Sequence, residues 1–326
     1  MTKYQFETTG TEVASDCAAS INDKVVLITG VSPGGLGATF ALTIAKHAPR
    51  LLILAGRNVS KIEETVADIA AIAPSVSTRL LKLDLSSQRQ VREAAREVNG
   101  YQEQIDVLVN NSGIMAVPFQ LTEDGIESQF ATNHIGHFLF TNLIVNKIAN
   151  SIDGKQVSRI VNVSSNGYRL SPIRFDDWNF ENGKTYNRWI SYGQTKTANM
   201  LFSKSLASKI GNRGILSLSL HPGTIHTNLS RSLGETDFGG LQELDLQQGN
   251  RQFWGGFNFK TLDQGVATHV FASFHESVSI KDDNGAYLED SRVFLPEEVG
   301  SWGRDEVEAE KLWKLSEEIL GEKFEY

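Results

Sequence analysis

Residues 24–37 read Lys-Val-Val-Leu-Ile-Thr-Gly-Val-Ser-Pro-Gly-Gly-Leu-Gly, an apolar run of strand length followed by a glycine-rich turn. The residues that come next have the periodicity of a helix. In such a strand-turn-helix unit, glycines let the backbone turn sharply, and free N–H groups at the start of the helix can bind a pyrophosphate. The stretch therefore predicts a dinucleotide-binding turn. A glycine-rich turn without a ligand is the alternative.

Short apolar runs and longer helical segments alternate along the rest of the chain. Strands are predicted at residues 25–29, 51–55, 78–83, 105–109, 159–163 and 216–220. Helices are predicted at residues 37–47, 60–72, 88–98, 122–148 and 194–210. This alternation predicts an α/β fold, a single Rossmann-type doubly wound parallel sheet with helices on both faces.

One catalytic domain is predicted from residue 23 to 326, because no repeat, low-complexity tract or proline-rich linker divides the chain. Residues 1–22 are polar and are expected to form a flexible N-terminal tail. Two stretches, near residues 166–190 and 230–260, are rich in aromatic residues and lack a clear period. Long aperiodic loops in a compact domain are often functional, so we expect both to cover a substrate, with plain surface insertions as the alternative.

The composition, with 40% hydrophobic and 21% charged residues in a chain of 326, is that of a folded protein with a large core. A net charge of -8 without a Lys/Arg cluster argues against a nucleic-acid partner. The apolar runs are too short to span a membrane. The start of the chain lacks the pattern of a secretory signal and Cys17 is the only cysteine, so a cytoplasmic location is expected.

The second predicted strand ends in Leu54-Ala55-Gly56-Arg57-Asn58, without an acid. An NAD-binding site of this type usually places an acid here, on the ribose 2'-hydroxyl. Arg57 can instead bind a 2'-phosphate through charge-assisted hydrogen bonds. We therefore expect NADP(H) in preference to NAD(H), with a solvated surface arginine as the alternative.

Further motifs follow the later strands. Asn110-Asn111-Ser112-Gly113 ends the fourth predicted strand, Ser164-Ser165 ends the fifth, and Tyr192 and Lys196 lie one turn apart on a helix. Together with the glycine turn, these motifs resemble the short-chain dehydrogenase/reductase family over residues 24–227.

The resemblance is closest to one branch of that family. The run Asn133-His134-Ile135-Gly136-His137-Phe138 and the region of Tyr192 are most similar to the retinol dehydrogenase and WW-domain-containing oxidoreductase branch. The chain departs from the family pattern by one extra residue in the glycine turn, which we place at Gly34, and by Ser112 in place of alanine.

The resemblance implies a catalytic tetrad of Asn133, Ser165, Tyr192 and Lys196. A tyrosine hydroxyl has a pKa of about 10, so it needs a nearby cation to act as an acid or base near neutrality. Lys196 would supply that charge from the same face of the helix. Ser165 would hydrogen-bond the reacting oxygen, and Asn133 would hold a water that links Lys196 to solvent.

Each of these residues also has a structural interpretation. The spacing of Tyr192 and Lys196 arises by chance in many helices, a serine at a strand end often forms a cap or turn, and Asn133 could simply bridge backbone groups. Ser165 is chosen over Ser164 because the family uses the second serine of this pair. The shared order of all the motifs favours the catalytic interpretation.

The resemblance also assigns the cofactor site. Asp84 matches a position that contacts the adenine, although an N-cap of the next helix is an equal alternative. The backbone at Ile225 and the hydroxyl of Thr227 would hold the nicotinamide carboxamide. The full predicted cofactor set is Thr29, Gly30, Ser32, Gly35, Leu36, Gly37, Arg57, Asp84, Leu85, Asn111, Ser112, Gly113, Tyr192, Lys196, Pro222, Gly223, Ile225 and Thr227.

These observations predict an NADP(H)-dependent oxidoreductase that transfers a hydride between nicotinamide and a carbonyl or secondary-alcohol carbon of a bulky, fairly apolar small molecule. The resemblance implies a homodimer or homotetramer. Two alternatives stay open: an epimerase or dehydratase of the extended branch acting on a nucleotide sugar, and a catalytically silent NADP(H)-binding regulator. No metal site is predicted, because the histidines have no matching cluster of carboxylates or thiols.

Overall fold

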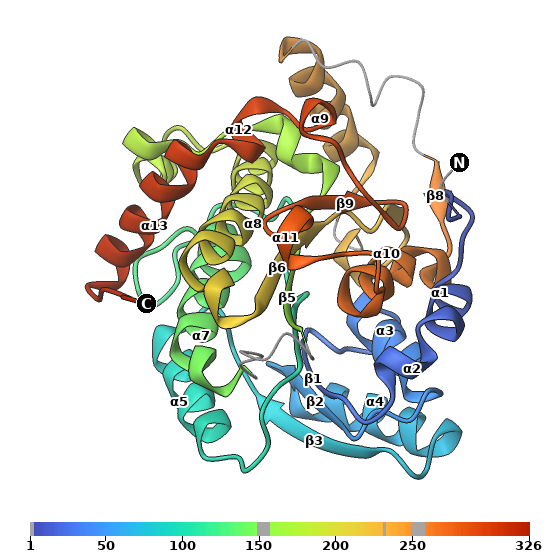
Figure 1. Ribbon diagram of the computed structural model, residues 1–326. Helices are drawn as coiled ribbons and strands as arrows, with labels where there is room; N and C mark the ends of the chain where they lie inside the picture. Colours follow the sequence, from blue (N-terminus) through green and yellow to red (C-terminus); the bar gives the residue numbers. More distant parts are fainter. Residues whose placement is uncertain (1–2, 149–156, 231–232, 249–257) are drawn as a thin grey trace.

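The computed structural model describes residues 3–148, 157–230, 233–248 and 258–326. Its centre is an eight-stranded sheet with strand order β10-β9-β6-β5-β4-β1-β2-β3 (Figure 1). The strands are β1 (Val25–Thr29), β2 (Leu51–Gly56), β3 (Ser77–Lys82), β4 (Val107–Asn110), β5 (Ser158–Val163), β6 (Ile215–Leu220), β9 (Tyr287–Glu289) and β10 (Arg292–Val293). Only the β9–β10 pair is antiparallel within this sheet. The predicted doubly wound Rossmann fold is confirmed.

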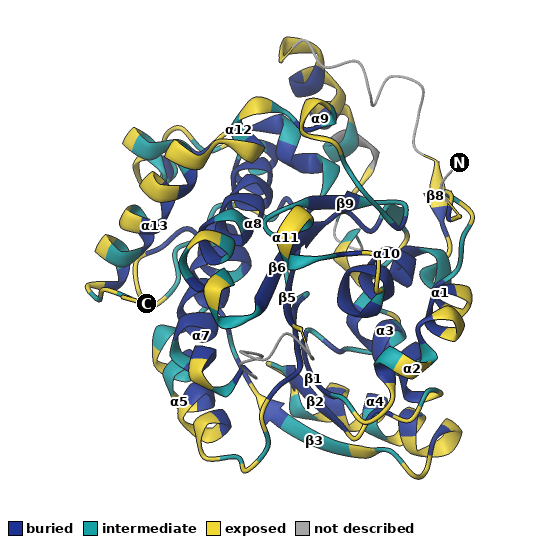
Figure 2. Cartoon of the chain, in the orientation of Figure 1, coloured by how far each residue is buried: buried dark blue, intermediate teal, exposed yellow. Residues whose placement is uncertain are grey.

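Helices cover both faces of the sheet (Figure 1). On one face lie α3 (Leu36–Ala45), α4 (Val59–Ile72) and α10 (Leu262–Phe274), and on the other lie α5 (Gln88–Asn99), α7 (Gly136–Ile144), α8 (Arg188–Ile210) and α13 (Glu306–Leu320). All five residues of β1 are buried, with Val25 and Leu27 in one apolar core and Val26 and Ile28 in the other. Figure 2 shows the same arrangement, with buried strands between helices whose outer faces are exposed. A strand buried on both faces explains the continuous apolar run in the sequence.

Several further elements are short. Among them are α11 (Ile280–Asp283), α12 (Ser301–Arg304), and 3₁₀ turns at Asn166–Leu170, Phe175–Asp177, Phe180–Gly183, Gly211–Arg213, Asn228–Ser230 and Pro296–Glu298. Two short parallel strands, β7 (Thr224–Ile225) and β8 (Phe259–Lys260), form a separate small sheet. The helix α9 (Glu235–Gln247) lies in the chain between them.

The helix predicted over residues 122–148 is wrong at its N-terminal end. Helical structure begins only with α6 (Ser128–Phe130), continues through a π-helical turn (Ala131–Ile135) into α7, and ends in a 3₁₀ turn at Val145–Lys147. The preceding residues form a turn with Gly125 in the left-handed region. The buried Glu127 carboxylate accepts the N–H groups of Gln129 and Phe130 and so starts the helix.

The segment before β1 differs from the expected tail. It contains α1 (Gly10–Asp16) and α2 (Ala18–Ile21), and Val13, Ala14 and Ile21 are fully buried. The hydroxyl of Thr11 donates to Asp263 at 3.0 Å, at the start of α10. A few apolar residues at helical spacing are enough to fasten this otherwise polar segment to the domain.

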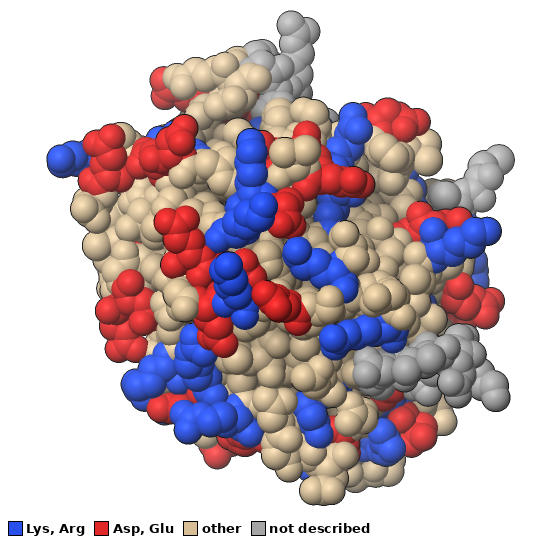
Figure 3. Space-filling model, turned by 60° about the vertical axis from the view of Figure 1, so that its left-hand side comes forward, with Lys and Arg blue, Asp and Glu red and all other residues tan. Residues whose placement is uncertain are grey.

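Acidic and basic side chains are mixed on the face shown in Figure 3. Ion pairs among the described residues include Arg292 with Glu298 at 2.7 Å and Arg92 with Glu322 at 2.7 Å. Within the described ranges, every helix is too short or too polar to cross a bilayer.

Candidate active site

The glycine turn joins the carboxyl end of β1 to α3. Gly30 adopts a left-handed backbone conformation with φ of 76°. A Cβ at Gly37 would lie 2.5 Å from the Gly30 carbonyl oxygen, so only glycine allows this close approach. Gly35 precedes α3 and provides no side-chain cap, which leaves the start of the helix available to an anion.

Residues that follow β4 hold the glycine turn in place through hydrogen bonds. The amide of Asn111 donates to the carbonyl oxygens of Thr29 and Gly30 at 2.8 and 3.2 Å. The buried Thr29 hydroxyl accepts the N–H groups of Asn111 and Ser112, both at 3.0 Å, and lies 3.0 Å from Nε2 of His137. Burial lowers the pKa of His137 to about 4, so its ring is neutral. These side chains therefore hold the backbone of the predicted cofactor site, with Thr29 and His137 buried behind the cleft and Asn111 on its lining.

The candidate adenine-binding end is shaped by a turn after β3. The carboxylate of Asp84 accepts hydrogen bonds from the N–H and the hydroxyl of Ser86, at 3.0 and 2.6 Å. The N-cap of α5 is Ser87, so the alternative interpretation of Asp84 as that cap is wrong. Arg57 is exposed and lies on the same cleft.

One large cleft, of about 1420 Å³, runs along the carboxyl ends of the central strands. In a doubly wound sheet, ligands bind at this edge, where the strand order reverses between β1 and β4. The predicted site residues that line the cleft are Gly30, Ser32, Gly35, Leu36, Arg57, Asp84, Leu85, Asn111, Ser112, Gly113, Ser165, Tyr192, Lys196, Pro222, Gly223, Ile225 and Thr227. Thr29, Gly37 and Asn133 are buried behind its wall.

Tyr192 and Lys196 reach the cleft from α8. The Lys196 Nζ lies 5.5 Å from the centroid of the Tyr192 ring and donates to the Val163 carbonyl oxygen at 3.0 Å. Burial raises the pKa of Tyr192 to about 12, opposed by its hydrogen bond with Ser165. Burial lowers the pKa of Lys196 to about 8. At neutral pH, the phenol and most of the ammonium groups therefore carry their protons.

The two serines after β5 have different surroundings. The hydroxyl of Ser164 donates to the carbonyl oxygen of Lys196 at 2.7 Å. The hydroxyl of Ser165 accepts a hydrogen bond from the N–H of Gly167 at 3.0 Å. It also forms a hydrogen bond with the side chain of Tyr192. A Cβ at Gly167 would lie 2.7 Å from Cε1 of Tyr192, so glycine lets this turn approach the phenol. Ser165 is thus the serine beside the tyrosine.

Asn133 lies in the π-helical turn before α7. Its Oδ1 accepts the N–H of Ile114 at 2.8 Å, and its Nδ2 donates to the Ile114 carbonyl and the Thr195 hydroxyl at 2.9 and 3.0 Å. The Asn133 amide therefore bridges backbone groups, as the structural interpretation of this residue expected. Its role in holding a water stays a prediction.

An apolar wall extends the cleft beyond Tyr192, and the sequence did not reveal it as a unit. Its members, which come from distant segments, are Met115, Leu170, Trp189, Leu233, Phe238 and Leu241. The Trp189 indole N–H donates to the carbonyl oxygen of Asp237 at 2.8 Å, and its ring lies 6.1 Å from that of Phe238. Trp189 lies almost one helical turn before Tyr192 on α8, so the two side chains share one face of the helix. This spacing was the one feature of the sequence that could have predicted part of the wall.

The two aromatic stretches contribute unequally to the cleft. In residues 166–190, Tyr168 and Phe180 are fully buried, and Phe175 and Trp178 pack against the main core. Most aromatic rings of this stretch therefore stabilise the fold instead of lining the cleft. In residues 230–260, Leu233, Phe238 and Leu241 line it, whereas positions 231–232 and 249–257 lie outside the described part of the chain.

Several histidines near the cleft have partners other than a metal ion. The described residues contain no group of three or more His, Cys, Asp or Glu side chains able to hold a metal ion. Burial lowers the pKa values of His134 and His221 to about 3. Nε2 of His134 lies 2.8 Å from the Ser316 hydroxyl, and the His226 ring stacks on that of Phe259 at 3.9 Å.

Comparison with known proteins gives consistent matches. The model of the short chain dehydrogenase family matches residues 24–175. Retinol dehydrogenase 13 of Homo sapiens is 38% identical, with 93% of this chain and 86% of that protein covered. Short-chain dehydrogenase TIC 32 A, chloroplastic, of Brassica napus is 35% identical, with 94% and 92% covered.

A solved structure of an uncharacterized protein from Mycobacterium paratuberculosis superimposes with a TM-score of 0.70 at 29% identity, covering 95% of this chain and 98% of that one. The glycine turn, the strand order and these relatives agree with one another. The chain therefore belongs to the short-chain dehydrogenase family of oxidoreductases and is similar to its retinol dehydrogenase branch.

Proposed function

We propose that the protein is an NADP(H)-dependent reductase of bulky, fairly apolar aldehydes or ketones, able to run in reverse as an alcohol dehydrogenase. The observation that carries this proposal is that Ser165, Tyr192 and Lys196 face the same cleft as the glycine turn. The uncapped start of α3 and the close approach of Gly37 to Gly30 fit a dinucleotide. When bound, nicotinamide supplies or accepts the hydride.

The catalytic side chains have separate roles in this proposal. Tyr192 gives its proton to the carbonyl oxygen of the substrate during reduction and takes one from the alcohol in reverse. The Lys196 ammonium stabilises the phenolate that is left, and Ser165 donates a hydrogen bond to the reacting oxygen. Because the phenol is protonated at neutral pH, it begins in the acid form that reduction requires.

The cofactor preference and the substrate class have their own support. The end of β2 carries Arg57 and no acid between residues 54 and 58, which suits a 2'-phosphate. The apolar wall beside Tyr192 suits a large apolar substrate. The human relative is named a retinol dehydrogenase, in agreement with such a substrate. Assembly as a homodimer or homotetramer and a cytoplasmic location stay predictions.

The test is turnover of purified protein with NADPH or NADH and a panel of apolar aldehydes and ketones. Tyr192→Phe should lower kcat by roughly 100-fold to 10,000-fold, because the general acid is lost. Tyr101→Phe is a matched control, since its hydroxyl bonds to Glu97 on the exposed surface. Turnover by Tyr192→Phe at the wild-type rate would contradict the mechanism, and NADPH binding without turnover of any carbonyl would support a silent regulator instead.

A further inference from the structure

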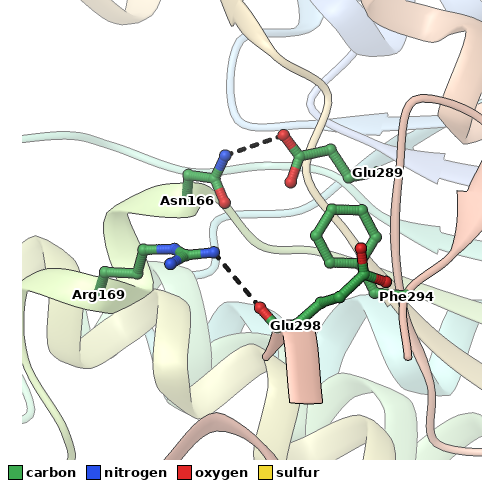
Figure 4. A pocket seen from close by; sticks show the side chains of 5 residues that line it. All are labelled: Asn166, Arg169, Glu289, Phe294 and Glu298. Carbon is green, nitrogen blue, oxygen red and sulfur yellow. Dashed lines mark hydrogen bonds between the residues drawn. The ribbon is translucent and has the colours of Figure 1, made fainter. Parts of the chain in front are cut away.

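A second cavity lies behind the turn that carries Ser165. It has a volume of about 410 Å³ and is lined by Asn166, Arg169, Glu289, Phe294 and Glu298 (Figure 4). Asn166 follows Ser165 directly and lines both this cavity and the large cleft. Contacts made in the second cavity can therefore act on the catalytic serine.

Both ends of the Asn166 amide are held by β9. Its Nδ2 donates to Oε1 of Glu289 at 2.9 Å, and its Oδ1 accepts the hydroxyl of Tyr287 at 3.1 Å. Figure 4 shows the first of these bonds crossing from the turn to the strand. An amide with a separate partner at each end has one favourable orientation, so the turn is fixed against the sheet.

The Ser165 hydroxyl depends on the same turn. Ser165 caps the 3₁₀ turn Asn166–Leu170, and its Oγ accepts the N–H of Gly167 at 3.0 Å. A shift of the Asn166 backbone would move this oxygen relative to Tyr192. Small displacements of a group that orients the reacting atoms reduce rates strongly.

We infer that Glu289, together with Tyr287, is a positioning residue that acts through Asn166 to orient the Ser165 hydroxyl toward the reacting oxygen. The inference rests on the proposed function of Ser165. It assigns a role in the reaction to β9, which extends the sheet beyond β6 and supplies none of the predicted catalytic residues. The Glu289 carboxyl is largely buried and lies near the charge of Asp290. Both effects, burial first, raise its pKa to about 7.

Glu298 supplies a matched control. It lines the same cavity, but its carboxylate pairs with both terminal nitrogens of Arg292, at 2.8 and 2.7 Å. Its backbone oxygen accepts a hydrogen bond from the Arg169 guanidinium. Glu298→Ala therefore alters the cavity without removing a bond to Asn166. Glu289→Gln retains an acceptor oxygen for the Asn166 amide while it removes the charge.

The experiment is steady-state kinetics with NADPH and one apolar aldehyde, with a melting temperature for each variant. Glu289→Ala should lower kcat by roughly tenfold, with KM for NADPH unchanged, whereas Glu289→Gln and Glu298→Ala should remain close to wild type. Tyr287→Phe should lower kcat less, because the bond that remains, from the Asn166 amide to the Glu289 carboxyl, is the shorter of the two. A fall in kcat for Glu298→Ala equal to that for Glu289→Ala, or no recovery with Glu289→Gln, would overturn the inference.

The double variant Ser165→Ala, Glu289→Ala separates positioning from a general structural effect. If Glu289 acts through Ser165, its removal should not lower kcat further once the hydroxyl is gone. Additive losses would overturn the inference while leaving the proposed function intact. If Ser165→Ala alone kept wild-type kcat, the proposed role of Ser165 would fail first, and the role of Glu289 would fail with it.

Discussion

The proposed cofactor side and the proposed substrate side of the cleft are built in different ways. On the cofactor side, the Asn111 amide donates to main-chain oxygens of the turn, and the Thr29 hydroxyl accepts main-chain N–H groups at the end of β4. On the substrate side, the apolar wall is assembled by ring packing between α8 and α9, for example Trp189 against Phe238. The first arrangement needs particular residues at fixed spacing, whereas the second needs only apolar side chains of suitable volume. We therefore expect the cofactor to be specified more tightly than the substrate.

The largest effect expected from a cofactor-side change comes from Arg57→Ala. Loss of charge-assisted hydrogen bonds to the 2'-phosphate should weaken NADPH binding by about 10-fold to 100-fold and leave NADH binding unchanged. Fluorescence titration with both cofactors measures this directly. Arg50→Ala is the control, because Arg50 lies just before β2, at the opposite end of that strand from Arg57, and is 4.0 Å from Asp23. Equal losses for the two cofactors would show that Arg57 does not read the 2'-phosphate.

The pH dependence of the reduction rate tests the roles of Tyr192 and Lys196, which lie between the two sides of the cleft. In the proposed mechanism, reduction requires the protonated forms of Tyr192 and Lys196, whose pKa values are about 12 and about 8. The rate of reduction should therefore be level below pH 8 and fall as the pH rises through it, approaching tenfold per further pH unit. Lys196→Arg keeps its positive charge at these pH values, so its rate of reduction should not fall as the pH rises through 8. A rate that rises through pH 8 would refute the assignment.

The smallest effect is expected on the substrate side. Trp189→Ala removes a large ring from the apolar wall and should raise KM for a bulky aldehyde by roughly fivefold to tenfold, because apolar contacts in a pocket are worth little each. NADPH affinity should not change. A small aldehyde serves as the internal control, since it does not reach the wall. An equal effect on both aldehydes would mean that Trp189 supports Tyr192 instead of selecting the substrate.

The same contrast explains what the sequence could predict. The strands β1 to β6 and the glycine turn follow from local patterns, since each apolar run or glycine spacing has one good structural solution. The tetrad members were identified by their order and their resemblance to a family, and the structure places Ser165, Tyr192 and Lys196 on one cleft.

Features that depend on tertiary contacts were missed. The helix expected from residue 122 begins at Ser128, because the buried carboxylate of Glu127 caps it there. The expected tail is fastened by Val13 and Ile21, whose partners lie far along the chain. Some aromatic residues expected to cover a substrate, such as Tyr168 and Phe180, fill the core, whereas Trp189 lines the cleft. No local pattern distinguishes a ring that packs inward from one that faces a ligand.

The pairing of β7 with β8 has a consequence for the segment between them. The two strands hold residues 224–225 beside 259–260, and the stacked rings of His226 and Phe259 reinforce that junction. The chain that leaves at one strand returns at the other, so whatever lies between begins and ends at a fixed place. Because both of its ends are fixed, a change in the length or sequence of this segment should alter the wall of the cleft that it supplies while leaving strands β1 to β6 in place.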